Sequence, residues 1–170
     1  MIKKHFFHLH LLLTCCLVLL LSSCAKKYNS TDLLGDSIDR ENTYIRDYLR
    51  SIGRDSGLMF HPSGICYKII LPGNGVDTIR SNSIPSIVYT TKILAGDKLI
   101  ESSQNLPTSF DNRPIRDHIL GWQIGLTLIT KGGRIILYIP SSFAYGHLGV
   151  PPNIPPNAIL ESDITLVDFK

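Results

Sequence analysis

The residues of this chain that could do chemistry form no recognisable catalytic triad or metal-binding set. His61, His118 and His147 lack the spacing of metal ligands, and no Ser-His-Asp order can be recognised. Cys66 stands in the alternating run "ICYKIIL", with no histidine or acidic neighbour in sequence to activate it. A buried, inert thiol is therefore favoured over a nucleophile. The sequence predicts neither a metal nor a cofactor.

One proline-rich stretch stands out beside an aromatic residue. The segment "YIPSSFAYGHLGVPPNIPPNAIL", residues 138–160, holds five of the chain's ten prolines, with two pairs at 151–152 and 155–156. Tyr145 lies just upstream of these pairs. Because each pyrrolidine ring fixes φ, the segment from residue 146 to 156 is predicted to be a stiff loop next to a tyrosine.

The first 23 residues have the build of a secretory signal peptide. Two lysines precede an apolar run from residue 11 to 21, which is too short for a confident membrane span. The sequence "LSSC" resembles the bacterial lipobox, in which cleavage precedes the cysteine and that cysteine receives the lipid. We therefore expect lipidation at Cys24. The alternative is an ordinary signal peptide followed by an incidental cysteine.

Removal of this signal changes the charge and the cysteine count. The formal net charge of +3 falls to +1 when Lys3 and Lys4 leave. A charge this small argues against a nucleic-acid partner bound through counterion release. Of the four cysteines, two leave with the signal and one is acylated, so Cys66 has no partner and a disulfide framework is excluded.

The remaining chain divides by composition and periodicity into three parts. Residues 24–36 are polar and rich in loop formers, which predicts a flexible tether. Residues 37–56 contain an amphipathic helix over 37–52, which we expect to pack on the domain or on a partner. Its stripe of apolar residues comprises Ile38, Ile45, Tyr48, Leu49 and Ile52. Residues 57–170 form the main domain.

Most of the main domain is predicted to be antiparallel β-sheet. The expected strands are rich in β-branched and aromatic residues and are joined by connections too short for crossover helices. They cover residues 64–71, 86–94, 97–102, 133–140 and 158–169. Between the third and fourth, Ile119, Trp122, Leu126 and Ile129 follow the helical period. The economical arrangement is an α+β fold in two layers, with one short helix across a curved antiparallel sheet.

Three segments of the main domain resemble the FKBP-type peptidyl-prolyl cis-trans isomerases in order and spacing. They are "VYTTKILAGDKLIESS", "ILGWQIGLTLITKGGR" and "IPSSFAYGHLG" followed by "IPPNAIL". The resemblance covers roughly residues 57–170. It implies a half-barrel wrapped around one short helix, and an activity that rotates Xaa-Pro peptide bonds in proline-containing polypeptides of the cell envelope.

The resemblance also implies a set of site residues. Trp122 matches the floor on which the prolyl ring rests, and Tyr89 and Tyr145 match two wall tyrosines, the second offering its hydroxyl to a substrate carbonyl. Ile119 matches a residue whose backbone N–H does similar work, and Ile154 matches an apolar residue of the overhanging loop. The remaining residues implied for the site are Glu101 and the pocket residues Ile100, Phe110, His118 and Ser162.

The pocket departs from the family pattern at several of these positions. Ile100-Glu101 replaces a Phe-Asp pair, Ser162 stands where a phenylalanine is usual, His118 is at a normally apolar position, and Thr91 replaces a glycine. We therefore expect weak catalysis, and still weaker binding of the family's macrolide inhibitors. The alternative function is a weak or inactive FKBP-like binding or scaffold lipoprotein.

The isomerase function and the binding alternative imply different protein partners but the same location in the cell envelope. In the binding alternative, the helix within residues 37–56 docks an envelope partner protein. Ala25 follows the lipid site, and no acidic run comes after it. These two features favour an outer-membrane anchor that faces the periplasm.

Overall fold

The computed structural model describes residues 30–170, and the side chains from residue 33 onward. Residues 34–170 form one compact unit. The predicted signal peptide and the predicted lipid site at Cys24 lie outside the described residues. Among the helices within residues 30–170, none is both long and apolar enough to cross a membrane.

The N-terminal helix α2 (Ser30–Ser51) begins seven residues before the predicted start at residue 37. The segment from 30 to 36 is therefore helical, where the sequence predicted part of a flexible tether. Gly35 and its polar neighbours resemble loop formers, but one glycine costs a helix only about 1 kcal/mol. The apolar stripe was expected to pack on the domain or on a partner. Ile45 and Leu49 are fully buried in a cluster with strand residues, whereas Ile52 at the end of the stripe is 45% exposed.

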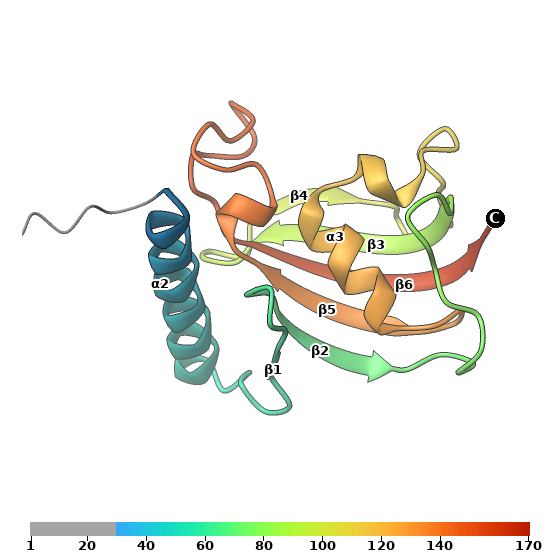
Figure 1. The fold of residues 1–170 in the computed structure, drawn as a ribbon, viewed down its shortest axis with the longest axis horizontal. Helices are drawn as coiled ribbons and strands as arrows, with labels where there is room; N and C mark the ends of the chain where they lie inside the picture. The colour runs from blue at the N-terminus through green and yellow to red at the C-terminus, as the bar shows by residue number, and fades with distance from the viewer. Residues whose placement is uncertain (1–29) are drawn as a thin grey trace, which may run out of the picture. The chain divides into compact units, whose positions relative to one another are not determined.

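The sheet has six antiparallel strands in the order β1-β2-β5-β6-β3-β4 (Figure 1). The five strands predicted from sequence are all present. They are β2 (Cys66–Leu71), β3 (Pro85–Ile93), β4 (Leu99–Ser102), β5 (Arg134–Ile139) and β6 (Leu160–Phe169). Strand β1 (Met59–Phe60) has only two residues and was not predicted, because so short a strand has no visible alternation.

Helix α3 (Leu120–Gly125) crosses one face of the sheet and continues as a 3-10 turn, Leu126–Leu128 (Figure 1). It approaches strand β5 closely because Gly121 and Gly125 lie directly over strand side chains, where a Cβ atom would overlap. A side chain at either position would push the helix away from β5.

The two helices cover opposite faces of the sheet. Alternate residues of β5 belong to two clusters: Leu137 and Ile139 pack with the α3 side, whereas Ile136 and Tyr138 pack with Ile45 of α2. Side chains alternate between the faces of a strand, so these clusters lie on different sides. The predicted two-layer arrangement is therefore extended by α2, which forms a partial third layer.

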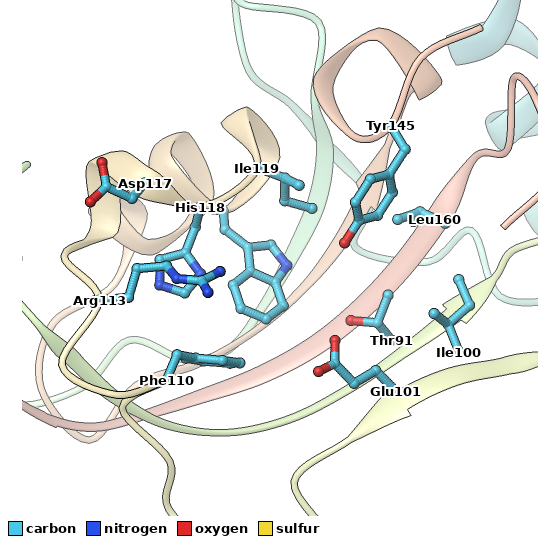
Figure 2. A pocket seen from close by; sticks show the side chains of 11 residues that line it. Thr91, Ile100, Glu101, Phe110, Arg113, Asp117, His118, Ile119, Tyr145 and Leu160 are labelled. Carbon is cyan, nitrogen blue, oxygen red and sulfur yellow. The ribbon is translucent and has the colours of Figure 1, made fainter. Parts of the chain in front are cut away.

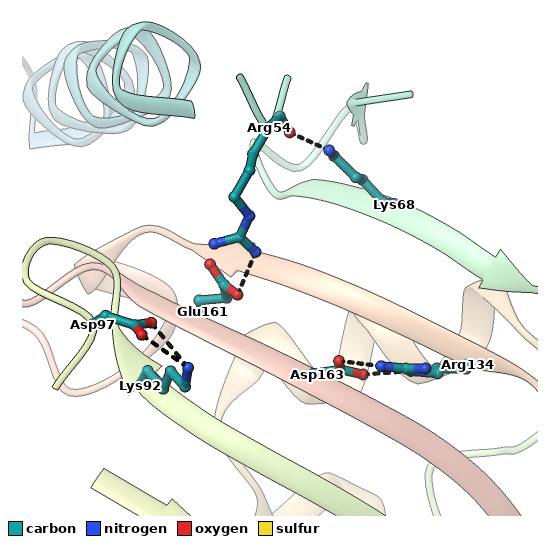
Figure 3. Close-up of polar contacts among 7 residues, drawn as sticks. All are labelled: Arg54, Lys68, Lys92, Asp97, Arg134, Glu161 and Asp163. Atoms are coloured by element: carbon teal, nitrogen blue, oxygen red, sulfur yellow. Dashed lines mark hydrogen bonds and ion pairs between the residues drawn. The ribbon is translucent and has the colours of Figure 1, made fainter. Parts of the chain in front are cut away.

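Ion pairs occupy the sheet face that α3 leaves uncovered (Figure 3). Arg54, which follows α2, contacts Glu161 of β6 at 2.7 Å, and Arg134 of β5 holds Asp163 through two bonds of 2.9 and 2.7 Å. Solvent-accessible pairs such as Arg134–Asp163 contribute roughly 0–1 kcal/mol. The Glu161 side chain is only 12% exposed, and the cost of its desolvation offsets much of its attraction to Arg54. The two apolar clusters, rather than these pairs, therefore account for most of the stability of the fold.

Candidate active site

A cavity of about 240 Å³ opens above the N-terminal end of α3 (Figure 2). Its walls come from strands β3 and β4, from the loop before α3, from the loop after β5 and from the start of β6. The lining residues are Thr91, Ile100, Glu101, Phe110, Arg113, Asp117, His118, Ile119, Trp122, Tyr145 and Leu160.

The tryptophan of this cavity is fixed by a buried polar network. Trp122 is 5% exposed, and its Nε1–H donates to Ser162 Oγ at 3.2 Å. Ser162 Oγ also lies 2.9 Å from Thr91 Oγ1, directly across the β3–β6 ladder. Tyr89 meets the indole edge-on, with ring centroids 5.0 Å apart and planes at 75°. The indole therefore has both its polar edge and one side held in place.

Two further rings extend the aromatic surface around Trp122. The His118 ring stacks on the indole at 5.5 Å and 21°, and the Phe110 ring packs 5.8 Å from the indole and 4.9 Å from the His118 ring. The resemblance implied that two aromatic rings are missing from the pocket lining, because Ile100 and Ser162 stand where phenylalanine is usual. In the structure, the ring of His118 replaces part of the missing aromatic surface.

The loop that supplies Phe110 has an unusual backbone. Phe110, Asp111 and Asn112 all have positive φ, at 51°, 56° and 64°. Left-handed conformations cost residues with side chains about 1 kcal/mol or more, and they persist only where the surroundings impose them. Packing of the Phe110 ring against Tyr89, 5.3 Å away, and against His118 supplies such a constraint.

Two hydrogen-bond donors belong to residues that line the cavity, one just before α3 and one just before the proline-rich loop. Tyr145 is 38% exposed, and its hydroxyl points toward the cavity (Figure 2). Burial, assisted by the nearby Glu101 carboxylate, raises the pKa of its hydroxyl, which therefore keeps its proton near neutral pH. Within residues 30–170, the Ile119 N–H donates to no other backbone carbonyl. Both groups are available to a ligand.

His118 is held as a neutral ring. Burial lowers the pKa of its imidazole, and within the described residues its buried Nε2 has no hydrogen-bond partner. A positive charge on this ring would be disfavoured by desolvation and by the nearby Arg113 guanidinium. The ring therefore contributes apolar surface to the cavity at neutral pH.

The proline-rich loop is closed by its own backbone hydrogen bonds. Val150 and Ile154 exchange two bonds of 2.8 and 2.9 Å, and the Asn157 N–H donates to the Gly146 carbonyl at 2.9 Å. At Gly149, with φ +63°, a Cβ atom would collide with the backbone of residues 154 and 155. These contacts restrain the loop in addition to its prolines.

Seven of the ten residues predicted for the site line the cavity. The other three are buried behind the lining: Tyr89, Ile154 and Ser162. Tyr89 and Ser162 contact Trp122 directly, whereas Ile154 packs into the core below the proline-rich loop.

Four lining residues are not among these ten: Thr91, Arg113, Asp117 and Leu160. Thr91 was named from the sequence only as a departure from the family pattern. Arg113 lies in an irregular loop and Asp117 ends a three-residue 3-10 helix, Ile115–Asp117, and neither segment is long enough to show a period in the sequence. Leu160 alternates with Ser162 along β6, so the strand pattern places both side chains on the same face of the sheet. The alternation could therefore have revealed Leu160.

The FKBP-type peptidyl-prolyl cis-trans isomerase family model matches residues 76–167, more than half of the chain. The chain therefore belongs to the FKBP-type peptidyl-prolyl cis-trans isomerase family. It is 38% identical to FK506-binding protein 4 of Dictyostelium discoideum over 112 residues, which are 66% of this chain and 30% of that protein. It is 32% identical to the FKBP-type isomerase FkpA of Escherichia coli K12 over 126 residues, 74% of this chain and 45% of that protein.

The crystal structure of Escherichia coli FkpA has the same fold. It superposes with a TM-score of 0.65 at 30% identity, covering 82% of this chain and 63% of that one. The chain spans less than half the length of the two relatives named above. Helix α2 lies outside the residues that the family model matches.

Proposed function

We propose that the protein catalyses cis-trans isomerisation of Xaa-Pro peptide bonds in proline-containing polypeptides. The observation that carries the proposal is the pocket floored by Trp122, whose indole is fixed from below by Ser162 and surrounded by the rings of Tyr89, Phe110 and His118. Such a surface fits a flat, apolar prolyl ring.

The reaction needs no nucleophile and no metal. The Xaa-Pro bond must rotate through a twisted state that loses amide resonance, against a barrier of roughly 18–20 kcal/mol. Water stabilises the planar amide through hydrogen bonds to its carbonyl. A dry aromatic pocket removes that stabilisation, and donors placed for the twisted amide lower the barrier further.

In this scheme the two free donors act on the carbonyls around the proline. The Tyr145 hydroxyl donates to a substrate carbonyl at the cavity mouth, and the Ile119 N–H donates at the end of α3. Glu101 lies near Tyr145 on the opposite wall (Figure 2), where its carboxylate helps keep that hydroxyl protonated. Ile100 and Leu160 complete the apolar wall.

Peptide isomerisation measured at several enzyme concentrations tests the proposal. Trp122→Leu should abolish most of the activity, and Tyr145→Phe should lower kcat/KM by roughly two- to tenfold, the value of about one hydrogen bond. Tyr138→Phe is the matched control. That tyrosine is fully buried on the α2 side, and its hydroxyl has no hydrogen-bond partner within residues 30–170.

The result that would overturn the proposal is a folded wild-type protein with no rate above the thermal background. Such a result would favour the binding-only function. Activity that is indifferent to both Trp122→Leu and Tyr145→Phe would instead mean that the site lies elsewhere. Circular dichroism of each variant establishes that it is folded.

We also propose that the mature protein is a lipoprotein of the cell envelope, anchored through Cys24 in the outer membrane and facing the periplasm. The support is the lipobox-like sequence before Cys24 and the polar residues that follow it. Several acyl chains on one cysteine provide stable anchoring. Cys24→Ala should lose palmitate incorporation and membrane retention, whereas Cys16→Ala should keep both. Wild-type retention of a processed Cys24→Ala protein would contradict the proposal.

A further inference from the structure

We propose that Glu41 of helix α2 is a positioning residue for Tyr145, so that this added helix takes part in shaping the pocket. The inference rests on the proposed isomerase function, in which the Tyr145 hydroxyl donates to the substrate. It concerns a residue 35 positions before the segment that the family model matches.

The Glu41 carboxylate holds the first residue of the turn that leads to Tyr145. Its Oε2 accepts a hydrogen bond from the Ser141 N–H at 2.6 Å, and its Oε1 accepts one from the Ser141 hydroxyl at 2.7 Å. Ser141 is only 4% exposed. Bonds to an ionised carboxylate are roughly twice as strong as neutral ones. Both polar hydrogens of Ser141 are thus bound by one side chain of α2.

Ser141 in turn holds the backbone on both sides of Tyr145. Its carbonyl accepts the N–H of Ala144 at 3.0 Å and the N–H of Gly146 at 2.8 Å. Gly146 has φ +61°, a left-handed conformation that glycine adopts at little cost. A shift of Ser141 would therefore move the two peptide groups that aim the Tyr145 ring into the cavity.

Helix α2 is a firm support for this contact. Ile45 and Leu49 are fully buried against the sheet. Ile38 packs against Gly64, where a Cβ atom would overlap it. Because the helix is anchored at several points on both sides of Glu41, the carboxylate has little freedom to follow a moving loop.

A double-mutant cycle tests whether Glu41 acts through Tyr145. Glu41→Ala should lower kcat/KM by about threefold in the wild-type background and by less than about 1.5-fold in the Tyr145→Phe background, because the group that it positions is then gone. Glu41→Gln, which can still accept the Ser141 N–H, should recover most of the activity. Asn42→Ala is the control on the same helix. It removes only the hydrogen bond that Asn42 Oδ1 accepts from Cys66 Sγ of β2 at 3.2 Å, and should leave kcat/KM unchanged.

Hydrogen exchange provides a second measurement that does not depend on catalysis. In Glu41→Ala, the amides of Ala144 and Gly146 should exchange about tenfold faster than in the wild type, and in Asn42→Ala they should not. Ser141→Ala, which keeps the N–H and loses the hydroxyl, should give a smaller increase. It also serves as the test if Glu41→Ala does not fold.

The outcomes separate this inference from the proposed function. Equal losses from Glu41→Ala in both backgrounds, or unchanged exchange at residues 144 and 146, would overturn the positioning role while leaving the isomerase function intact. An inactive wild type would overturn the isomerase function. In that case unchanged exchange in Glu41→Ala would also refute the contact, whereas faster exchange would support it.

Discussion

Replacing Ser162 by alanine should weaken the floor of the pocket, because one hydroxyl serves two buried partners. In the wild type, Ser162 Oγ accepts from Trp122 Nε1 at 3.2 Å and lies 2.9 Å from Thr91 Oγ1. The exposed fractions of these three residues are 0%, 5% and 5%. In Ser162→Ala the indole N–H and the Thr91 hydroxyl both remain buried without their partner.

The size of the effect follows from this geometry. A buried donor left unpaired costs roughly 1–3 kcal/mol, while the lost hydroxyl leaves almost no cavity. We expect the free energy of unfolding to fall by about 2 kcal/mol. Thr91→Val leaves the Ser162–Trp122 bond in place and should cost about 1 kcal/mol. The double variant should cost less than the sum, because both changes remove the same contact.

Urea unfolding followed by tryptophan fluorescence is the appropriate assay, since Trp122 is the only tryptophan in the chain. Ser86→Ala is the matched control. It makes the same chemical change at a partly buried position of β3 outside the pocket, and should shift the free energy by less than about 0.5 kcal/mol. If Ser162→Ala were as mild as Ser86→Ala, the hydroxyl would not be what holds the indole.

Other substitutions test titration and packing, each by urea unfolding monitored by circular dichroism. The free energy of unfolding of the wild type should fall as the pH drops below about 6.5, because burial lowers the pKa of His118 in the folded protein and the unfolded chain therefore binds the proton first. His118→Leu should make this fall less steep. An unchanged slope would refute the role of His118. Leu49→Ala should lower the free energy of unfolding by about 2–5 kcal/mol, whereas Leu34→Ala, at a half-exposed position of the same helix, should lower it by less than about 0.5 kcal/mol. Equal small losses would show that α2 adds nothing to the core. Gly125→Ala should destabilise the protein, because the added Cβ atom would overlap a leucine of β5. Gly35→Ala has open space around it and should raise the free energy of unfolding by about 0.5–1 kcal/mol. A change of the same sign in both variants would contradict the packing of α3.

The elements of this fold were predictable where a local pattern is strong. The five longer strands show β-branched alternation bounded by turn residues, and each was found in the structure within a few residues of its predicted limits. Helix α2 was predicted from its apolar stripe, but its start was wrong because its first two turns, residues 30–36, contain Gly35 and none of that stripe. Propensity near a helix end is too weak to locate the end.

The site was predictable only in part, for a different reason. The resemblance assigned the rings of the pocket to positions in the chain, yet the contacts that hold them depend on register. Thr91 and Ser162 meet because β3 and β6 pair at those two residues, and a shift of one strand by one position would place their side chains on opposite faces of the sheet. The bond from Glu41 to Ser141 joins residues 100 positions apart, and no local pattern in the sequence marks it.

Cys66 gives this domain a chemical reporter of local motion. It is the only cysteine within residues 30–170, it lies fully buried beneath α2, and burial raises the pKa of its thiol to about 12. A thiol reagent can therefore react only in molecules whose helix has lifted from the sheet. The ratio of the labelling rate to that of an unprotected thiol gives the population of this open form. If labelling is faster than the population of fully unfolded molecules allows, α2 detaches as a separate cooperative unit while the pocket stays folded.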